Sequence, residues 1–356
     1  MDQQHVLHGS LLLGMVAYET NGERRNRQPA EKRRSLRAGR YRGLCRLTDR
    51  SRPWSAVAAC MTLSVLAGIE TARERYALKK GDGNMRQEIE ATERDALLVE
   101  DAALIRMMGM PVLEAVPSRG APYERTDPFI LVHEGRFRLS EMSGKDTKHP
   151  HRGFDNLWYV LQGSASTGHT TGPGGSVERA RLSEGSLLAL RTGRGAWHAE
   201  AVGADEVEEG HGDTEFRSVL FWVNLARKDK NVEPSAQVVQ PEQIPKRREG
   251  GAIVRVLVGE GSPVHLGTPA LILDVELPEG GTVTTPVPPE FQGFAYMLEG
   301  EGAFGANLRP ARPPQLVLMG PGEEFTVTEA APRTRYLLMS GQPYGEEPVF
   351  NGPFVD

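Results

Sequence analysis

LWYVLQGSA, residues 157–165, carries the pattern that decides the fold, because it is an apolar run that ends in a glycine turn. LSEGSLLALRTG, residues 182–193, adds a second apolar run between glycine turns. FAYMLEGEGAFG at 294–305 and QLVLMGPGEEF at 315–325 repeat this order of run, turn and run. The repeat indicates two similar domains in tandem, and we place the division between them near residues 240–250.

Short apolar or alternating runs occupy the chain after Pro111, and turns that contain glycine or proline separate them. These runs are 128–134, 157–163, 186–191, 218–225, 252–259, 270–277, 293–300, 315–319 and 335–339. No long helical pattern interrupts them, and the 40 Gly and 25 Pro fit many short strands. The sequence therefore predicts an all-β protein, a sandwich or a barrel.

The N-terminal region differs in composition from the rest of the chain. Residues 1–52 carry twelve Lys or Arg and five Asp or Glu, a net charge of +7, whereas the whole chain is at −5. Residues 53–356 therefore carry −12, with acidic and basic side chains interspersed, and we expect no direct binding to nucleic acid. Both cysteines, Cys45 and Cys60, precede the strand-rich part, so that part has no disulfide and no thiolate metal site.

Residues 55–69 form an uncharged run of fifteen, shorter than the roughly 20 residues that a membrane span needs. Three interpretations stay open: a buried helix, the apolar core of a cleaved targeting segment, or a wrongly predicted gene start. Residues 85–108 have helical composition and predict an amphipathic helix. We expect residues 1–105 to be a partly helical or disordered extension outside the strand domains.

Two pairs of metal-ligand side chains stand out. His149 and His151 lie at i and i+2 in KHPHRGFD, residues 148–155, and His198 and Glu200 lie at i and i+2 in GRGAWHAEAV, residues 193–202. Alternate side chains of a strand share one face, so each segment would present two ligands to one point. Three imidazoles and one carboxylate suit a first-row divalent ion: iron, manganese, nickel, copper or zinc.

The remaining histidines favour plainer roles. A single HxH is often a turn or surface feature, and only the second pair makes a metal site the better interpretation. His169 lies in a turn rich in Gly and Thr, so we expect it near the mouth of the site and not on the metal. We expect His211 to be solvated, and His133 and His265 to serve core or surface packing.

Several motifs resemble those of the pirin family, within the cupin superfamily: TDPFILVHE, HPHRGFDN, GSLLALRTGRGAWHAE, LFWVNL, EQIP and QPYGEEPVFNGPFV. The resemblance runs in order from about Val112 to Asp356 and leaves residues 1–100 uncovered. It implies a bicupin, in which two antiparallel jelly-roll β-barrels pack face to face and the N-terminal barrel holds one mononuclear metal. We therefore expect the metal-binding barrel at 106–240 and a barrel without metal at 241–356.

The resemblance places the family's ligands on His149, His151, His198 and Glu200, the same four residues that the spacing selects. It implies one divalent metal, Fe(II) first, with manganese, nickel, copper or zinc as alternatives. Asp155 stands where the family more often has Glu. We predict that Asp155 supports the ligands without touching the metal.

The resemblance implies two functions of different class. The first is an iron-dependent quercetin 2,3-dioxygenase, which opens the central ring of a flavonol with dioxygen; Glu200 would stay a ligand or act as its general base. Trp158, Tyr159 and Trp197 would line a flat pocket or pack in the core. The alternative is a non-enzymatic, iron-binding nuclear transcriptional co-regulator that acts through a protein partner. We favour the dioxygenase.

The basic run EKRRSLRAGRYR, residues 31–42, suits a nuclear address or an organelle transit segment about equally. We expect a cytoplasmic or nuclear protein, with import into an organelle as the alternative. We also expect a monomer without a membrane span, which takes a small aromatic, flavonol-like substrate or a protein partner.

Overall fold

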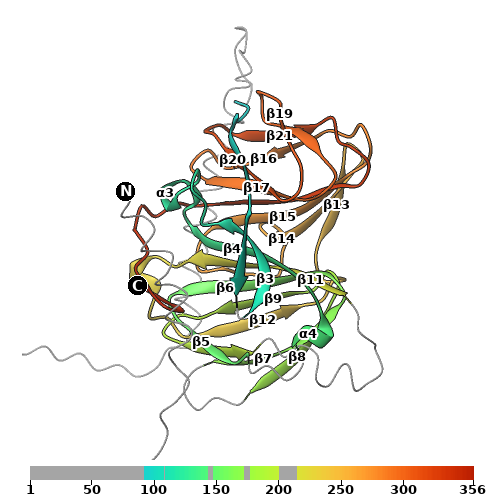
Figure 1. Cartoon of the computed structure of the whole chain (residues 1–356). Coiled ribbons are helices and arrows are strands. Elements are labelled where there is room, and N and C mark those ends of the chain that lie inside the picture. The colour runs from blue at the N-terminus through green and yellow to red at the C-terminus, as the bar shows by residue number, and fades with distance from the viewer. Residues whose placement is uncertain (1–91, 108, 143–146, 172–176, 200–214) are drawn as a thin grey trace, which may run out of the picture. The chain divides into compact units, whose positions relative to one another are not determined.

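A computed structural model describes residues 92–107, 109–142, 147–171, 177–199 and 215–356. The predictions for residues 1–52 and 55–69, for Glu200 and for His211 lie outside these residues. The described residues belong to one structural unit that consists almost entirely of antiparallel strands (Figure 1). Among them, no helix is both long enough and apolar enough to cross a membrane.

The first barrel has a seven-stranded sheet in the order β12-β9-β6-β11-β4-β3-β2 and a four-stranded sheet in the order β5-β10-β7-β8. The strands are β2 (Ala103–Met107), β3 (Met110–Val116), β4 (Phe129–Arg138), β5 (His149–His151), β6 (Phe154–Gln162), β7 (Ser164–Thr170), β8 (Glu178–Ser183), β9 (Leu187–Arg191), β10 (Ala196–Ala199), β11 (Glu215–Asn224) and β12 (Ser235–Val239). Among the described residues, three short helices lie on the connections: α3 (Tyr123–Thr126), α4 (Leu139–Met142) and the 3-10 helix η1 (Arg227–Asp229).

The second barrel repeats this topology, with sheets in the orders β1-β20-β17-β22-β15-β14-β13 and β16-β21-β18-β19. Its strands are β1 (Ala96–Asp101), β13 (Lys246–Glu249), β14 (Ala252–Val258), β15 (Ala270–Leu277), β16 (Val283–Pro286), β17 (Gln292–Glu299), β18 (Gly302–Phe304), β19 (Arg309–Ala311), β20 (Gln315–Met319), β21 (Glu324–Thr328) and β22 (Thr334–Gly341). A final hairpin contains β23 (Phe350–Asn351) and β24 (Phe354–Val355). Strands β2–β11 thus correspond one by one to β13–β22, as the sequence repeat predicts.

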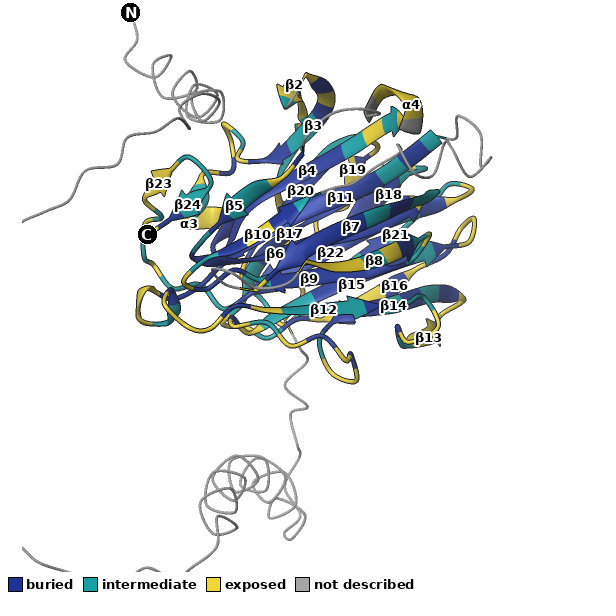
Figure 2. Ribbon diagram, turned by 90° about the horizontal axis from the view of Figure 1, so that it is seen from below, coloured by how far each residue is buried: buried dark blue, intermediate teal, exposed yellow. Residues whose placement is uncertain are grey.

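The two seven-stranded sheets pack against each other, and this explains the continuous apolar runs. On β6, Trp158 and Val160 belong to the core of the first barrel, whereas Leu157 and Tyr159 belong to a core shared with β17 and β22 of the second. A strand buried on both faces needs apolar side chains at every position. Figure 2 shows buried residues along β6 and β9 and exposed residues in the loops and at outer strands. The prediction of an all-β protein with two antiparallel barrels packed face to face is confirmed.

The predicted helix over residues 85–108 is wrong for its described part, which forms β1 and β2. Strand β1 pairs with β20 at the edge of the second barrel's sheet, and β2 pairs with β3 at the edge of the first. An extension that lies outside both barrels up to residue 105 is therefore also wrong from Ala96 onward. Pairing with two open sheet edges outweighs the weak helical preference of this segment. The boundaries at 105 and 240 otherwise stay predictions.

Arg94 anchors the start of this segment in the second barrel. It is 1% exposed, and its guanidinium donates hydrogen bonds to the carbonyls of Pro288 (2.7 Å), Phe291 (2.9 Å) and Gly320 (2.9 Å). A buried cation held by three loop carbonyls ties those loops to the incoming strand.

Removal of residues 1–104 should therefore loosen the second barrel. Such a chain lacks β1 and leaves the three carbonyls without their buried donor, at a cost of about 1–3 kcal/mol for each unsatisfied group. We expect amide hydrogen exchange in β20 and β17 to accelerate strongly, whereas a chain that starts at residue 92 serves as the matched control. Equal protection of β20 in the two chains would contradict the role given to β1 and Arg94.

Asp274 of β15 joins the two barrels through a buried charge network. Its side chain is 0% exposed, accepts two hydrogen bonds from Arg335 (2.9 and 2.8 Å) and lies 3.5 Å from Arg255. The Tyr159 hydroxyl, from β6 of the first barrel, donates to the same carboxylate at 2.7 Å. A charge this deep is stable only while its partners remain.

We expect Asp274→Ala to lower the free energy of unfolding by about 3 kcal/mol, because it leaves two guanidinium groups and a tyrosine hydroxyl without their acceptor. Glu276→Gln is the matched control on the same strand, since Glu276 pairs with Arg255 at 2.9 Å but is 43% exposed. Its effect should stay below about 1 kcal/mol. Urea unfolding measures both, and equal effects would refute the account of the network.

Candidate metal centre

Strands β5 and β10 place three histidines on one face of the four-stranded sheet. The strands are antiparallel neighbours, with His198 opposite His149 and Ala196 opposite His151. Alternate residues of each strand turn the same way, so His149, His151 and His198 all face the barrel interior. Trp197 turns the other way and is 43% exposed.

The three imidazoles meet at their Nε2 atoms. His198 Nε2 lies 2.9 Å from His151 Nε2 and 2.9 Å from His149 Nε2. His151 and His198 are buried at 1% and 2% exposure, and His149 is partly buried. Ligand atoms of the three residues all lie within 4.8 Å of one another. The structure thus brings together three of the four predicted ligands, and the role of Glu200 stays a prediction.

Carbonyl groups behind two of the rings fix their tautomers. His149 Nδ1 lies 2.6 Å from the Thr147 carbonyl, and His151 Nδ1 lies 3.4 Å from the Pro353 carbonyl. A carbonyl only accepts, so each Nδ1 carries a proton, and in the neutral form of such a ring the lone pair lies on Nε2. Both lone pairs point toward His198.

Burial keeps two of the rings uncharged. It lowers the pKa of His151 well below its ordinary value, and the neighbouring His149 lowers that pKa further. Burial lowers the pKa of His198 in the same way, with His151 as the next cause. Neutral imidazoles with free lone pairs are the form that binds a metal ion.

This arrangement fits a divalent cation. Without a cation, Nε2 of His198 carries at most one proton, which it can donate to Nε2 of His149 or of His151 but not to both. The lone pair of the other ring then has no donor. His198 Nδ1 is also buried without a hydrogen-bond partner among the described residues. A cation at the centre would accept all three Nε2 lone pairs with each ring protonated at Nδ1. The donor set of imidazoles without thiolates suits first-row divalent ions.

Two aromatic side chains that sequence reasoning missed line this cluster. Phe154 and Trp222 stack with ring centroids 4.1 Å apart, and both contact the His151 ring at centroid distances of 5.2 and 5.1 Å. Both are buried, so they keep water from one side of His151. Phe154 follows the HPH stretch by three residues, and this proximity was the signal available in the sequence.

Of the three aromatic residues that were expected to line a flat pocket or to pack in the core, two lie in cores and one is exposed. Trp158 lies in the first barrel's core and donates to Ser218 at 2.9 Å, and Tyr159 points toward the second barrel. Trp197 is exposed, with the Lys148 ammonium 5.5 Å from its ring centroid. Core packing is therefore confirmed for Trp158 and Tyr159, and these three side chains do not form a flat pocket together.

Two further predictions need correction. His169 is not in a turn: it lies in β7 opposite His198, is 4% exposed, and pairs with Glu178 at 3.6 Å. Asp155 does not support the ligands, because Arg191 Nε donates to one of its oxygens at 3.1 Å and the Gly267 amide to the other at 2.6 Å. Asp155 thus links the first barrel to the connection before β15.

Two other histidines have the packing roles that were expected. His133 is buried and bonded to Glu114 at 2.9 Å, and His265 is exposed.

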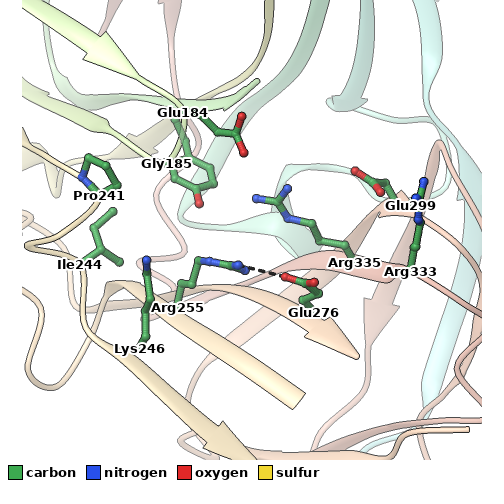
Figure 3. A pocket seen from close by; sticks show the side chains of 11 residues that line it. Glu184, Gly185, Pro241, Ile244, Lys246, Arg255, Glu276, Glu299, Arg333 and Arg335 are labelled. Atoms are coloured by element: carbon green, nitrogen blue, oxygen red, sulfur yellow. Dashed lines mark hydrogen bonds and ion pairs between the residues drawn. The ribbon is translucent and has the colours of Figure 1, made fainter. Parts of the chain in front are cut away.

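A cavity of about 410 Å³ lies between the barrels, and none of the three histidines lines it. Its lining carries four basic side chains, Lys246, Arg255, Arg333 and Arg335, and three acidic ones, Glu184, Glu276 and Glu299 (Figure 3). Arg335 and Arg255 already form ion pairs with Asp274. The near balance of charge selects no class of ligand, so the histidine cluster is the stronger functional candidate.

Known proteins share both the sequence and the fold. The family model described as the pirin C-terminal cupin domain matches residues 272–356. A pirin-like protein from Solanum lycopersicum is 32% identical over 262 residues, which are 72% of this chain and 81% of that protein.

Two solved structures share the fold. A quercetin 2,3-dioxygenase from Acinetobacter baumannii aligns with a TM-score of 0.65 at 23% identity, over 74% of this chain and 92% of that one. A bacterial pirin from Escherichia coli, in complex with nickel(II), aligns with a TM-score of 0.52 at 13% identity, over 69% and 99%. These two structures show the fold, and the relative from Solanum lycopersicum, of whose length the match covers more than two thirds, shows that the chain belongs to the pirin family.

Proposed function

We propose that this chain is an iron-dependent dioxygenase of the quercetin 2,3-dioxygenase type, with one divalent metal at His149, His151 and His198. The observation that carries the proposal is the convergence of three Nε2 atoms, two of them on fully buried rings. Membership of the pirin family and the fold shared with a bacterial quercetinase support this reaction class.

The histidines would hold the metal through Nε2, and Glu200 would be the fourth ligand or the general base. When bound, the metal supplies Lewis acidity and the redox chemistry that lets a flavonol react with dioxygen. Glu200 follows His198 by two residues, so it is expected on the same face of the chain. As a base, its carboxylate would take the proton of the flavonol 3-hydroxyl group.

The surroundings of the histidines suit this chemistry. Burial holds His151 and His198 neutral, so protons do not compete with a metal for Nε2. Phe154 and Trp222 exclude water beside His151, which strengthens electrostatic interactions at the site.

A second candidate function is that of an iron-binding transcriptional co-regulator. It is favoured by Trp197, which lies between Ala196 and His198 on β10 and exposes 43% of its surface outside the barrel. A change at the metal would be transmitted along this strand to an exposed aromatic residue, the kind of side chain that anchors protein contacts.

We expect the purified full-length chain to bind about one divalent ion, and His149→Ala or His198→Ala to abolish this binding, because two lone pairs do not hold the ion as three do. His169→Ala is the matched control, since His169 is a buried neighbour of His198 outside the converging group. Metal analysis after dialysis measures the content. Full retention in the His149 and His198 variants would refute the site.

Iron-loaded protein should consume quercetin in air and release carbon monoxide, with loss of the visible absorption of the flavonol. Glu200→Gln should slow turnover about 100-fold, because it removes the base that takes the hydroxyl proton. Absence of turnover above that of free iron would exclude the quercetinase and leave the co-regulator as the better function.

A further inference from the structure

The C-terminal hairpin, Val349–Asp356, returns from the second barrel to the metal centre of the first. Its two ends pair through hydrogen bonds between Val349 and Asp356 at 2.9 and 3.0 Å. The Val355 amide donates to the Arg152 carbonyl at 2.9 Å, directly after the ligand His151. The Val355 side chain is 0% exposed and belongs to the core of the first barrel.

The chain before the hairpin is tied to the first barrel as well. The amides of Tyr344 and Gly345 both donate to Asp127 at 2.7 Å, and Glu346 accepts from the Arg227 amide at 2.6 Å. These contacts hold the connection from β22 to the hairpin across the first barrel. These contacts therefore fix the position of the hairpin on the first barrel.

The ligand segment is shaped to receive the hairpin. Gly153 has φ +92, and a Cβ atom there would overlap the Val355 carbonyl oxygen. The Arg152 side chain also pairs with Asp356 at 2.7 Å, which adds a second contact between the ligand segment and the hairpin. Lys230 is 4% exposed and donates to the Gly153 carbonyl at 2.9 Å, so a buried side chain also holds the turn at Gly153.

We propose that the hairpin is a positioning element for the metal ligand His151. The Pro353 carbonyl, 3.4 Å from His151 Nδ1, holds the proton on Nδ1 and turns the Nε2 lone pair toward His149 and His198. This carbonyl is the acceptor that a metal-bound imidazole needs behind it. The inference rests on the proposed metal site and adds that the last eight residues set its affinity.

Nickel(II) binding to the full-length chain tests the proposal, in comparison with a chain that ends at Gly352 and with Asp356→Lys. Loss of the hydrogen-bond partner of a ligating histidine weakens metal binding by about 10–100-fold, and we expect this in the truncated chain. Asp356→Lys should weaken binding less, through repulsion of Arg152. Glu347→Lys is the matched control, since it makes the same charge change at an exposed position of the same segment and should leave the affinity unchanged. Wild-type affinity in a folded, truncated chain would overturn the proposal.

A second measurement does not depend on any variant or on metal. Two-bond ¹H–¹⁵N correlation of the histidine rings in the metal-free wild-type chain should show His151 protonated at Nδ1. Protonation at Nε2 would overturn the role of the Pro353 carbonyl. If the wild type shows the expected tautomer but binds no nickel(II), the proposed metal site fails while the contact from the hairpin stands.

Discussion

Three imidazoles converge on one buried point, and to hold a cation there they would keep their Nε2 lone pairs inward and their protons outward. The first barrel is arranged around this constraint. The register of β5 and β10 brings the rings together. The Thr147 and Pro353 carbonyls receive the outward protons of His149 and His151. Because Pro353 lies after the last strand of the second barrel, the centre in one barrel depends on chain supplied from beyond the other.

The second barrel has the same strand order but has no such centre among its described residues. Its strands β16 and β21 correspond to β5 and β10, and their buried residues Val283, Thr285, Phe325 and Val327 fill the position with mostly apolar side chains. The second barrel and the chain on either side of it instead contact the first barrel at three places. Asp274 accepts from Tyr159, the Gly267 amide donates to Asp155, and the C-terminal hairpin pairs with Arg152. The first barrel thus holds the histidine cluster, and the second barrel supports it.

The parts of the fold that follow from local periodicity could be predicted from the sequence. The apolar runs predict the strands of both barrels, and the HxH spacing predicts rings on one face of a strand. Residues 92–107 could not be predicted as strands, because they are held by sheet edges from distant parts of the chain. The contacts of Asp155 with Gly267 and of Tyr159 with Asp274 could not be predicted either, because more than a hundred residues separate the members of each pair. The contact of Trp222 with His151 is hidden in a similar way, because 71 positions of the chain separate the two residues.

The central claim is that three imidazoles of β5 and β10 hold one metal ion. X-ray absorption spectroscopy at the nickel edge of the nickel-loaded full-length chain tests it most directly, because multiple scattering from imidazole rings counts the histidine ligands. The account predicts three imidazoles per metal ion in the wild-type chain. A wild-type spectrum with one imidazole or none would contradict it.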